Sequence, residues 1–180
     1  SFVINNYLMG KEPFPFDLLY WNDDSTNMPY AMHSFYLRNM YRDNALIKKG
    51  GITMNNVPID ITTIDTPAYF LSTREDHIAP WKATYAGTQY FNGDITFTLA
   101  ASGHIAGVVN PPEKKKYCYW SSGKLPKDAD HWIKSAEENE GSWWPHWQNW
   151  IKNFSNGQVP ARKIGKAIED APGSYVKVQS

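Results

Sequence analysis

Cysteine is nearly absent from the sequence. Cys118 is the single cysteine among 180 residues, so the chain cannot form an internal disulfide, and this favours a reducing compartment. Lysine plus arginine number 18, as do aspartate plus glutamate, so no net charge attracts nucleic acid or an anionic membrane. No apolar run approaches the roughly 18 residues of a membrane span, and the first residues do not resemble a signal peptide. We therefore expect no nucleic-acid partner and no membrane span.

Patterns that bind metals are also missing. The sequence has no HExxH or paired-cysteine motif, and His33, His131 and His146 have no metal-ligand partner at a suitable spacing. We therefore expect no metal site. The segment around Cys118, Lys-Lys-Tyr-Cys-Tyr-Trp, lacks the glycines of a strand-to-helix elbow. We interpret Cys118 as a packing or surface residue rather than a nucleophile.

Aromatic residues, in contrast, are abundant: the sequence has 8 tryptophans, 11 tyrosines and 8 phenylalanines. Helical spacing places an apolar stripe on one face of the segment that follows Ser142, made of Trp143, Trp147, Trp150, Ile151 and Phe154. We predict that this stripe packs as core against a sheet. The alternative is a surface that faces a partner or a polymer.

A chain of this length can form one domain with a sizeable core. Its central part has a short apolar run at 68–71, a helical segment at 80–91, and a run at 95–100 rich in β-branched and aromatic residues. A strand, a helix and a second strand of these lengths form a βαβ crossover, so the predicted fold class is α/β with a parallel sheet. Further predicted elements are a helix within 28–47, a hairpin around 55–56, helices at 128–138 and 142–154, and a short strand at 175–178, while residues 1–28 are predicted to be mostly loop.

Two residues suited to acid–base chemistry follow the two predicted parallel strands. Asp76 lies a few residues after the first strand and His104 just after the second. Because the carboxyl ends of parallel strands meet at one edge of a sheet, we expect both side chains to lie over the same crevice. A histidine base needs a carboxylate to fix its tautomer and to stabilise the imidazolium. Gly103, directly before the histidine, suits a tight turn or a close backbone approach.

Other interpretations of these residues stay open. Glu75 can compete as the acid, His77 can act as a second base, and Asp76 can instead cap the following helix or pair with Arg74. An acid followed by a histidine completes the catalytic triad of α/β-hydrolases, whose order along the chain is nucleophile, acid, histidine. No residue upstream of Asp76 fits the role of nucleophile, so the sequence predicts the later part of a catalytic site.

Several long and uncommon motifs extend over nearly the whole chain. They are Asn-Tyr-Leu-Met-Gly-Lys at 6–11, Phe-Asp-Leu-Leu-Tyr-Trp-Asn at 16–22, Met-His-Ser-Phe-Tyr-Leu-Arg-Asn at 32–39, Arg-Glu-Asp-His-Ile at 74–78, Ser-Gly-His-Ile-Ala-Gly at 102–107 and Gly-Ser-Trp-Trp-Pro at 141–145. In these motifs the chain resembles the C-terminal part of the catalytic domain of class I poly(3-hydroxyalkanoate) synthases, the bacterial polyester polymerases.

The resemblance implies the C-terminal portion of an α/β-hydrolase fold, with part of a cap subdomain at 1–60 and the core at 61–180. It implies a Cys-Asp-His triad that acts on hydroxyacyl-CoA thioesters, with Asp76 and His104 as acid and histidine and the cysteine upstream of this chain. His104 would deprotonate that cysteine, and Asp76 would help to activate the 3-hydroxyl group that attacks next. Trp21 would line the substrate or pack near the site, and His77 would lie near it.

The resemblance also implies the partners. The substrate is (R)-3-hydroxyacyl-CoA, and this coenzyme A thioester is consumed rather than retained, so no cofactor is expected. The other expected partners are the growing polyester chain, the surface of cytoplasmic polyhydroxyalkanoate granules, the upstream part of the synthase and a second copy in a homodimer. Because the nucleophile is missing, the chain alone is expected to be inactive. The alternatives are a thioesterase or polyester depolymerase of the same fold, and a non-catalytic aromatic-rich binding module.

Overall fold

The computed structural model describes residues 3–12, 27–174 and 178. Contacts divide the chain into two units, Ser1–Ser34 with Val159–Ser180 and Phe35–Gln158. In the first unit, a π-helix at Val3–Leu8 stands where the sequence predicts mostly loop. The predicted strand at 175–178 falls outside the described residues except for its last position. The boundary between cap and core near residue 60 stays a prediction.

The predicted helix within 28–47 is a series of shorter helical pieces. Helix α2 spans Tyr30–Tyr36, a π-helix continues it over Leu37–Arg42, and a 3-10 helix follows at Ala45–Ile47. The predicted hairpin is confirmed: β1, Thr53–Met54, pairs antiparallel with β2, Val57–Pro58. The two asparagines between these strands both have positive φ, 49° and 64°, as a tight primed turn requires.

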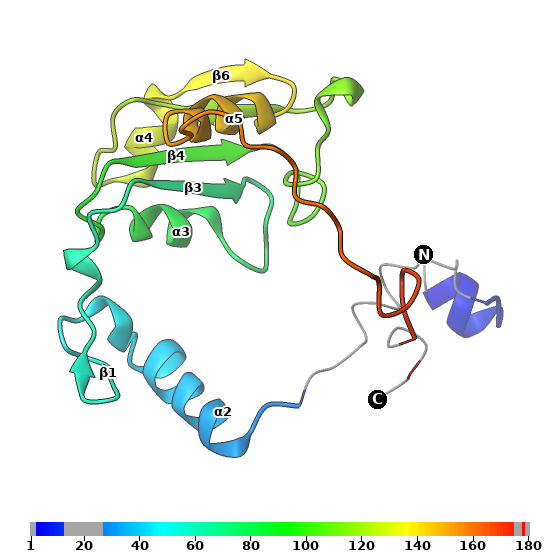
Figure 1. Cartoon of the computed structure of the whole chain (residues 1–180), viewed down its shortest axis with the longest axis horizontal. Helices are drawn as coiled ribbons and strands as arrows, with labels where there is room; N and C mark the ends of the chain where they lie inside the picture. Colours follow the sequence, from blue (N-terminus) through cyan, green and yellow to red (C-terminus); the bar gives the residue numbers. More distant parts are fainter. Residues whose placement is uncertain (1–2, 13–26, 175–177, 179–180) are drawn as a thin grey trace. The chain divides into compact units, whose positions relative to one another are not determined.

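A mixed four-stranded sheet forms the centre of the second unit (Figure 1). Strands β3, Ala68–Thr73, and β4, Ile95–Ala100, are parallel, and helix α3, Trp81–Gly87, connects them. This confirms the α/β class and the predicted crossover. Helix α3 is shorter than the predicted 80–91, because the chain leaves the helix in turns after Gly87.

Two antiparallel strands that the sequence patterns do not predict extend this sheet. Strand β5, Cys118–Ser121, pairs with β4, and β6, Glu137–Glu140, pairs with β5 at the sheet edge. The sequence of β6 is Glu-Glu-Asn-Glu, whose residue types are depleted in strands, so the predicted helix at 128–138 extends too far. Helix α4 spans only Ala129–Ser135, and the Asp128 side chain caps its start by accepting from the His131 N–H.

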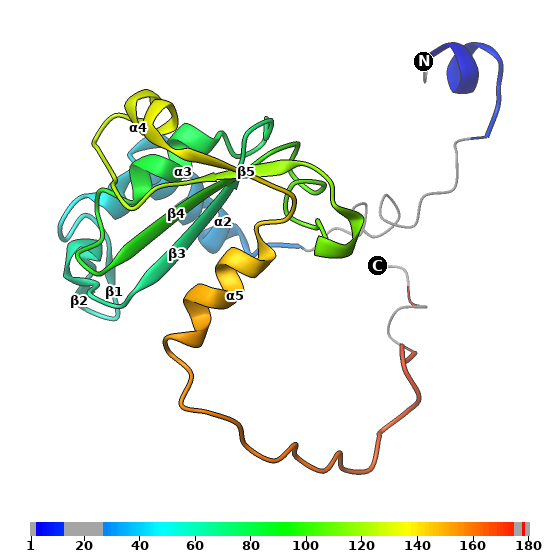
Figure 2. The ribbon, with the colours of Figure 1, turned by 90° about the horizontal axis from the view of Figure 1, so that it is seen from above.

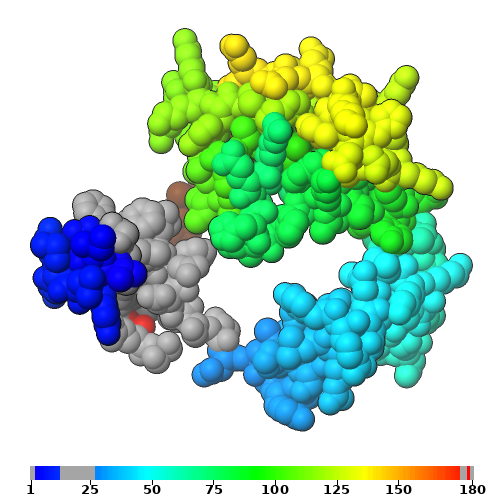
Figure 3. Space-filling view, turned by 180° about the vertical axis from the view of Figure 1, so that it is seen from behind, coloured from blue at the N-terminus to red at the C-terminus, as the bar shows by residue number. Residues whose placement is uncertain are grey.

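The main core lies between one face of the sheet and helices α3 and α4 (Figure 2). It is aromatic, and its buried residues are Tyr85, Phe97, Leu99, Trp120 and Trp132. The rings of Phe97 and Trp132 meet edge-on, with centroids 4.8 Å apart. Helices α3 and α4 also touch each other, and Figure 3 shows the green and yellow atoms of this part of the chain in contact. Lys82 Nζ of α3 lies 2.6 Å from Asp130 Oδ1 of α4.

Helix α5, Trp144–Lys152, covers the opposite face of the sheet (Figure 2). It meets the sheet at Tyr69, which contacts the rings of Trp143, His146 and Trp150, and Tyr69 Oη lies 2.8 Å from His146 Nδ1. The contact face of the helix therefore follows positions 143, 146 and 150.

The predicted burial of the aromatic stripe is wrong for three of its residues. Trp147, Ile151 and Phe154 are 42%, 38% and 48% exposed. These residues are themselves spaced by four and three, so they share a face that the contact through His146 turns away from the sheet. None of the described helices is both long and apolar enough to cross a bilayer.

Candidate active site

The structure brings the side chains of Asp76 and His104 into direct contact. His104 Nδ1 lies 2.7 Å from Asp76 Oδ2. Asp76 comes from the loop after β3 and His104 from the loop after β4, so the two residues meet at the carboxyl ends of the parallel strands. This is the position at which open α/β sheets place their reactive groups.

Backbone hydrogen bonds beyond the strand ends hold the two loops together. The N–H of Arg74 donates to the carbonyl of Ala100 over 2.8 Å, and the N–H of Glu75 donates to the carbonyl of Ser102 over 3.0 Å. Ser102 itself has a left-handed φ of 73°, which turns the chain just before His104. The parallel pairing of β3 with β4 thus continues into both loops and fixes the distance between them.

The close approach expected at Gly103 occurs instead at Gly107. A Cβ atom at Gly103 would have open space around it. At Gly107, a Cβ atom would lie 2.4 Å from the Ala101 carbonyl oxygen and 2.6 Å from Thr73 Cγ2. Gly107 therefore lets the end of the His104 loop dock onto the end of β3. Sequence reasoning missed it because nothing in the local pattern shows which glycine meets another segment.

Asp76 is almost enclosed and fully engaged. Its side chain is 8% exposed, and its Oδ1 accepts hydrogen bonds from the N–H groups of Ile78 and Ala79, both at 2.9 Å. The hydrogen bond from Ala79, followed by those from His104 and Ile78, lowers the pKa of Asp76 to about 2, against the opposing effect of burial. The carboxyl group is therefore ionised at neutral pH.

The alternative roles considered for Asp76 do not fit this geometry. Helix α3 begins at Trp81 with Pro80 as its N-cap, so Asp76 stabilises the preceding turn and not the helix start. Arg74 places its guanidinium 4.8 Å from the ring centroid of Trp120. The partner of the Asp76 carboxylate is therefore the imidazole of His104.

His104 presents a reactive nitrogen on its far side. Its side chain is 48% exposed, and Nδ1 is occupied by the carboxylate of Asp76. In the neutral ring, Nδ1–H then donates to Asp76, and Nε2 is the nitrogen able to accept a proton. This arrangement suits a general base that removes a proton from a nucleophile.

The other residues singled out near the site do not join this pair. Glu75 and His77 are exposed, and within the described part of the chain neither forms a hydrogen bond or ion pair with Asp76 or His104. Trp21 lies outside the described residues. In the described ranges, no group of three or more histidine, cysteine, aspartate or glutamate side chains could hold a metal ion.

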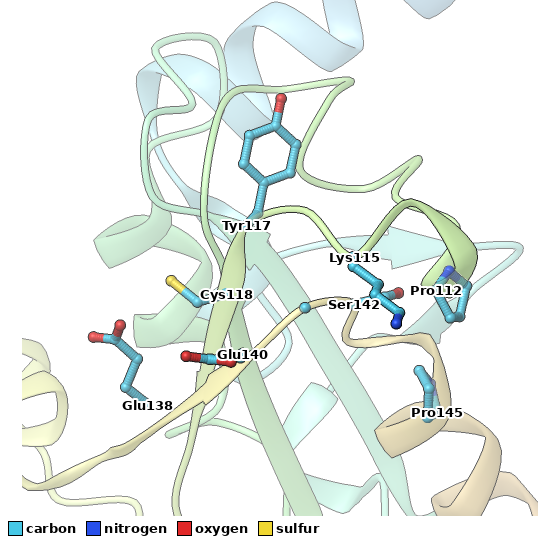
Figure 4. A pocket seen from close by; sticks show the side chains of 9 residues that line it. Pro112, Lys115, Tyr117, Cys118, Glu138, Glu140, Ser142 and Pro145 are labelled. Carbon is cyan, nitrogen blue, oxygen red and sulfur yellow. The ribbon is translucent and has the colours of Figure 1, made fainter.

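Cys118 lies on β5 beside Glu138 and lines an open pocket of about 620 Å³ (Figure 4). Burial, and then the charge of Glu138, raise the pKa of the Cys118 thiol. A raised pKa disfavours the thiolate, which is the nucleophilic form. The environment of Cys118 therefore agrees with a packing residue.

Comparison with known proteins identifies the relatives of the chain. No family model matches it. It is 51% identical over 182 residues to the poly(3-hydroxyalkanoate) polymerase subunit PhaC of Rhizobium meliloti, a match that covers 99% of this chain and 30% of the relative. It is 44% identical over 189 residues to PhaC of Cupriavidus necator, covering 100% of this chain and 31% of the relative. The chain belongs to the PhaC polymerase family.

The poly(3-hydroxyalkanoate) polymerase of Methylorubrum extorquens shows the same relationship. It is 45% identical over 185 residues, which is 100% of this chain and 30% of the relative. The PhaC-family chain thus spans about 30% of the length of the curated relatives it matches. The contact between Asp76 and His104 lies within this matched region.

Proposed function

We propose that this chain is the C-terminal part of a poly(3-hydroxyalkanoate) polymerase with an α/β-hydrolase core. In this role it supplies the acid, Asp76, and the base, His104, of a Cys-Asp-His triad that polymerises (R)-3-hydroxyacyl-CoA and releases coenzyme A. The 2.7 Å contact between the two side chains at the ends of parallel strands is the observation that carries the proposal. The polymerase names of its relatives support the substrate class.

In this proposal each group has its own step. His104 Nε2 accepts the proton of a cysteine thiol that belongs to the preceding part of the enzyme, and the thiolate attacks the thioester carbon. The carbon–sulfur bond to coenzyme A breaks, and the departing thiolate takes the proton back from the imidazolium. The enzyme is left acylated through its cysteine, ready for attack by the 3-hydroxyl group of another acyl unit.

Asp76 acts in this scheme through His104. Its Oδ1 accepts two backbone N–H groups and its Oδ2 contacts the imidazole, so neither oxygen is free for a substrate hydroxyl. A carboxylate with a pKa of about 2 is also a weak base. We therefore assign to Asp76 the orientation of His104 and the stabilisation of its positive charge, and to His104 the activation of both the thiol and the hydroxyl.

A chimeric enzyme tests the proposal. The chain replaces the matching region of the Rhizobium meliloti polymerase, and release of coenzyme A from 3-hydroxybutyryl-CoA is measured. We expect an active chimera, in which His104→Ala and Asp76→Asn each lower kcat by roughly 100-fold or more. Glu75→Gln, the exposed neighbouring carboxylate, is the matched control and is expected to retain activity.

Two results would contradict the proposal: an inactive chimera under conditions in which the parent polymerase works, or an active chimera that tolerates His104→Ala. The product separates the proposed reaction from hydrolysis. A polymerase forms polyester of high mass, whereas a thioesterase or depolymerase of the same fold forms free hydroxy acid. The proposal also includes a cytoplasmic location at polyester granules and a homodimeric enzyme. Sedimentation of the chimera together with granules tests the granule association.

A further inference from the structure

The loop that carries His104 is held by two tryptophan side chains from the start of helix α5. Trp143 Nε1 donates to the carbonyl oxygens of Gly107 and Val108, both at 3.2 Å. Trp144 Nε1 donates to the carbonyl of Val108 over 2.9 Å. These carbonyls lie three and four residues after His104, at the end of its loop.

The opposite side of the same loop rests on the sheet. Gly107 fits against the Ala101 carbonyl and the methyl group of Thr73, and Thr73 is only 1% exposed. The N–H of Gly107 also donates to the Gly103 carbonyl over 3.0 Å, which closes the loop on itself. The loop is therefore fixed between a buried strand end on one side and two indole N–H groups on the other.

The ring of Trp143 and the backbone of Trp144 are themselves held in place. The ring of Trp143 packs on Tyr69 of β3, with centroids 6.3 Å apart. The backbone N–H of Trp144 donates to Ser142 Oγ over 3.1 Å, which fixes the backbone at the start of the helix. Indole N–H groups are donors only, and both of these donate to backbone carbonyls of the His104 loop.

We propose that Trp143 and Trp144 are positioning residues for His104, a role that rests on the proposed function of the Asp76–His104 pair. His104 is half exposed and is held at its side chain by one contact with Asp76. Its orientation therefore depends on the backbone of its loop. Without the indole donors, the carbonyls of Gly107 and Val108 turn toward water, and the imidazole leaves the position in which it reaches both Asp76 and the incoming thiol.

Substitution of tryptophan by phenylalanine tests the N–H donor separately from the packing of the ring. In the chimera, Trp143→Phe combined with Trp144→Phe keeps aromatic packing but removes both N–H groups. We expect kcat to fall by roughly tenfold to a hundredfold with KM changed less than about twofold, because a small misplacement of a catalytic group affects the chemical step. Trp147→Phe is the control: Trp147 is 42% exposed, and its indole forms no hydrogen bond within the described residues.

A spectroscopic measurement reads the loop position without activity. The proton between His104 Nδ1 and Asp76 gives a downfield NMR resonance, assigned by its loss in His104→Ala. In the 180-residue chain, we expect this resonance to shift or broaden in the double phenylalanine variant and to stay unchanged in Trp147→Phe. Gly107→Ala, which pushes the loop from the sheet side, should have the same effect, whereas Gly103→Ala should not. If the double phenylalanine variant does not fold, the comparison of Gly107→Ala with Gly103→Ala still tests whether the loop position controls His104.

The outcomes distinguish this proposal from the proposed function. If His104→Ala leaves the chimera active, the proposed function is wrong, whatever the tryptophans do. If His104→Ala abolishes activity while the folded double variant keeps the parental kcat and an unchanged resonance, the tryptophans do not position His104. A loss of kcat with a perturbed resonance in the double variant, and neither effect in Trp147→Phe, supports the assignment.

Discussion

At the scale of single residues, the site depends on how completely one carboxylate is satisfied. Asp76 accepts hydrogen bonds from the N–H groups of Ile78 and Ala79 and contacts the imidazole of His104. Hydrogen bonds to the ionised form lower the pKa of a carboxyl group, and here they outweigh the effect of burial. The contact with Asp76 also fixes the tautomer of His104 and leaves its Nε2 able to accept a proton.

This low pKa predicts how stability depends on acid. The folded-state pKa of Asp76 is about 2 and its ordinary value is 3.8, so its stabilising contribution is complete above about pH 4 and is lost as the pH falls toward 2. We expect Asp76→Asn to be less stable than the parent chain at pH 6 and to lose less further stability between pH 4 and 2. Urea unfolding at a series of pH values measures this. Equal losses in both proteins would contradict it.

At the scale of elements, helix α5 is attached to the sheet through a neutral histidine. His146 Nδ1 lies 2.8 Å from Tyr69 Oη and 3.5 Å from Thr98 Oγ1, and its ring also contacts Tyr119. Burial lowers the pKa of His146 below its ordinary value of 6.5. Burial likewise raises the pKa of Tyr69 to about 12, so the phenol is protonated and able to donate to the imidazole. The docking of α5, and with it the tryptophans that hold the His104 loop, depends on His146 being uncharged.

We therefore expect α5 to dock less firmly as the pH falls. Because the folded-state pKa of His146 is depressed, its contribution to stability is complete above pH 6.5 and declines below that value as the unfolded chain binds the proton more readily. His146→Gln should remove this part of the pH dependence. Thermal unfolding followed by circular dichroism between pH 7.5 and 5 compares the two proteins, with His131→Gln, an exposed histidine on α4, as the control. Parallel profiles for His146→Gln and the parent chain would show that His146 does not govern docking.

At the scale of the whole molecule, the β3 edge of the sheet is open. Within the described residues, β3 pairs only with β4, and its other edge has no partner. The N–H groups of Ala68 and Arg74 donate to the carbonyls of Asp94 and Ala100, on the β4 side. Because successive N–H groups of a strand point to opposite sides, the N–H groups of Tyr69, Leu71 and Thr73 point to the open edge. An exposed strand edge of this kind is a site for pairing with another strand. In the proposed enzyme, the part of the chain that precedes this one supplies the pairing strand.

Hydrogen exchange examines this proposal directly. In the isolated chain, we expect the amides of Tyr69, Leu71 and Thr73 to exchange quickly and those of Phe70 and Ser72 to be protected. In the chimera with the Rhizobium meliloti polymerase, all five should be protected, since both edges of β3 are then paired. Fast exchange at the open-edge positions of an active chimera would mean that the upstream part joins this chain elsewhere.

Local patterns determined the centre of this protein from sequence. The apolar runs of β3 and β4 and the helix between them favour the parallel crossover that the structure shows, and parallel strands bring the residues that follow them to one edge. For this reason the meeting of Asp76 with His104 was predictable without coordinates. Strand β6 was not, because Glu137–Glu140 is extended only through its pairing with β5.

The tertiary structure alone decided which residues support the site. Gly107, and not Gly103, makes the close approach, because Thr73, which is far away in the sequence, meets it together with the carbonyl of the nearby Ala101. The exposed side of α5 follows from the contact of His146 with Tyr69, which rotates Trp147 away from the sheet. Periodicity specifies that a helix has an apolar face, but the orientation of that face and the partners of its polar atoms depend on groups far away in sequence.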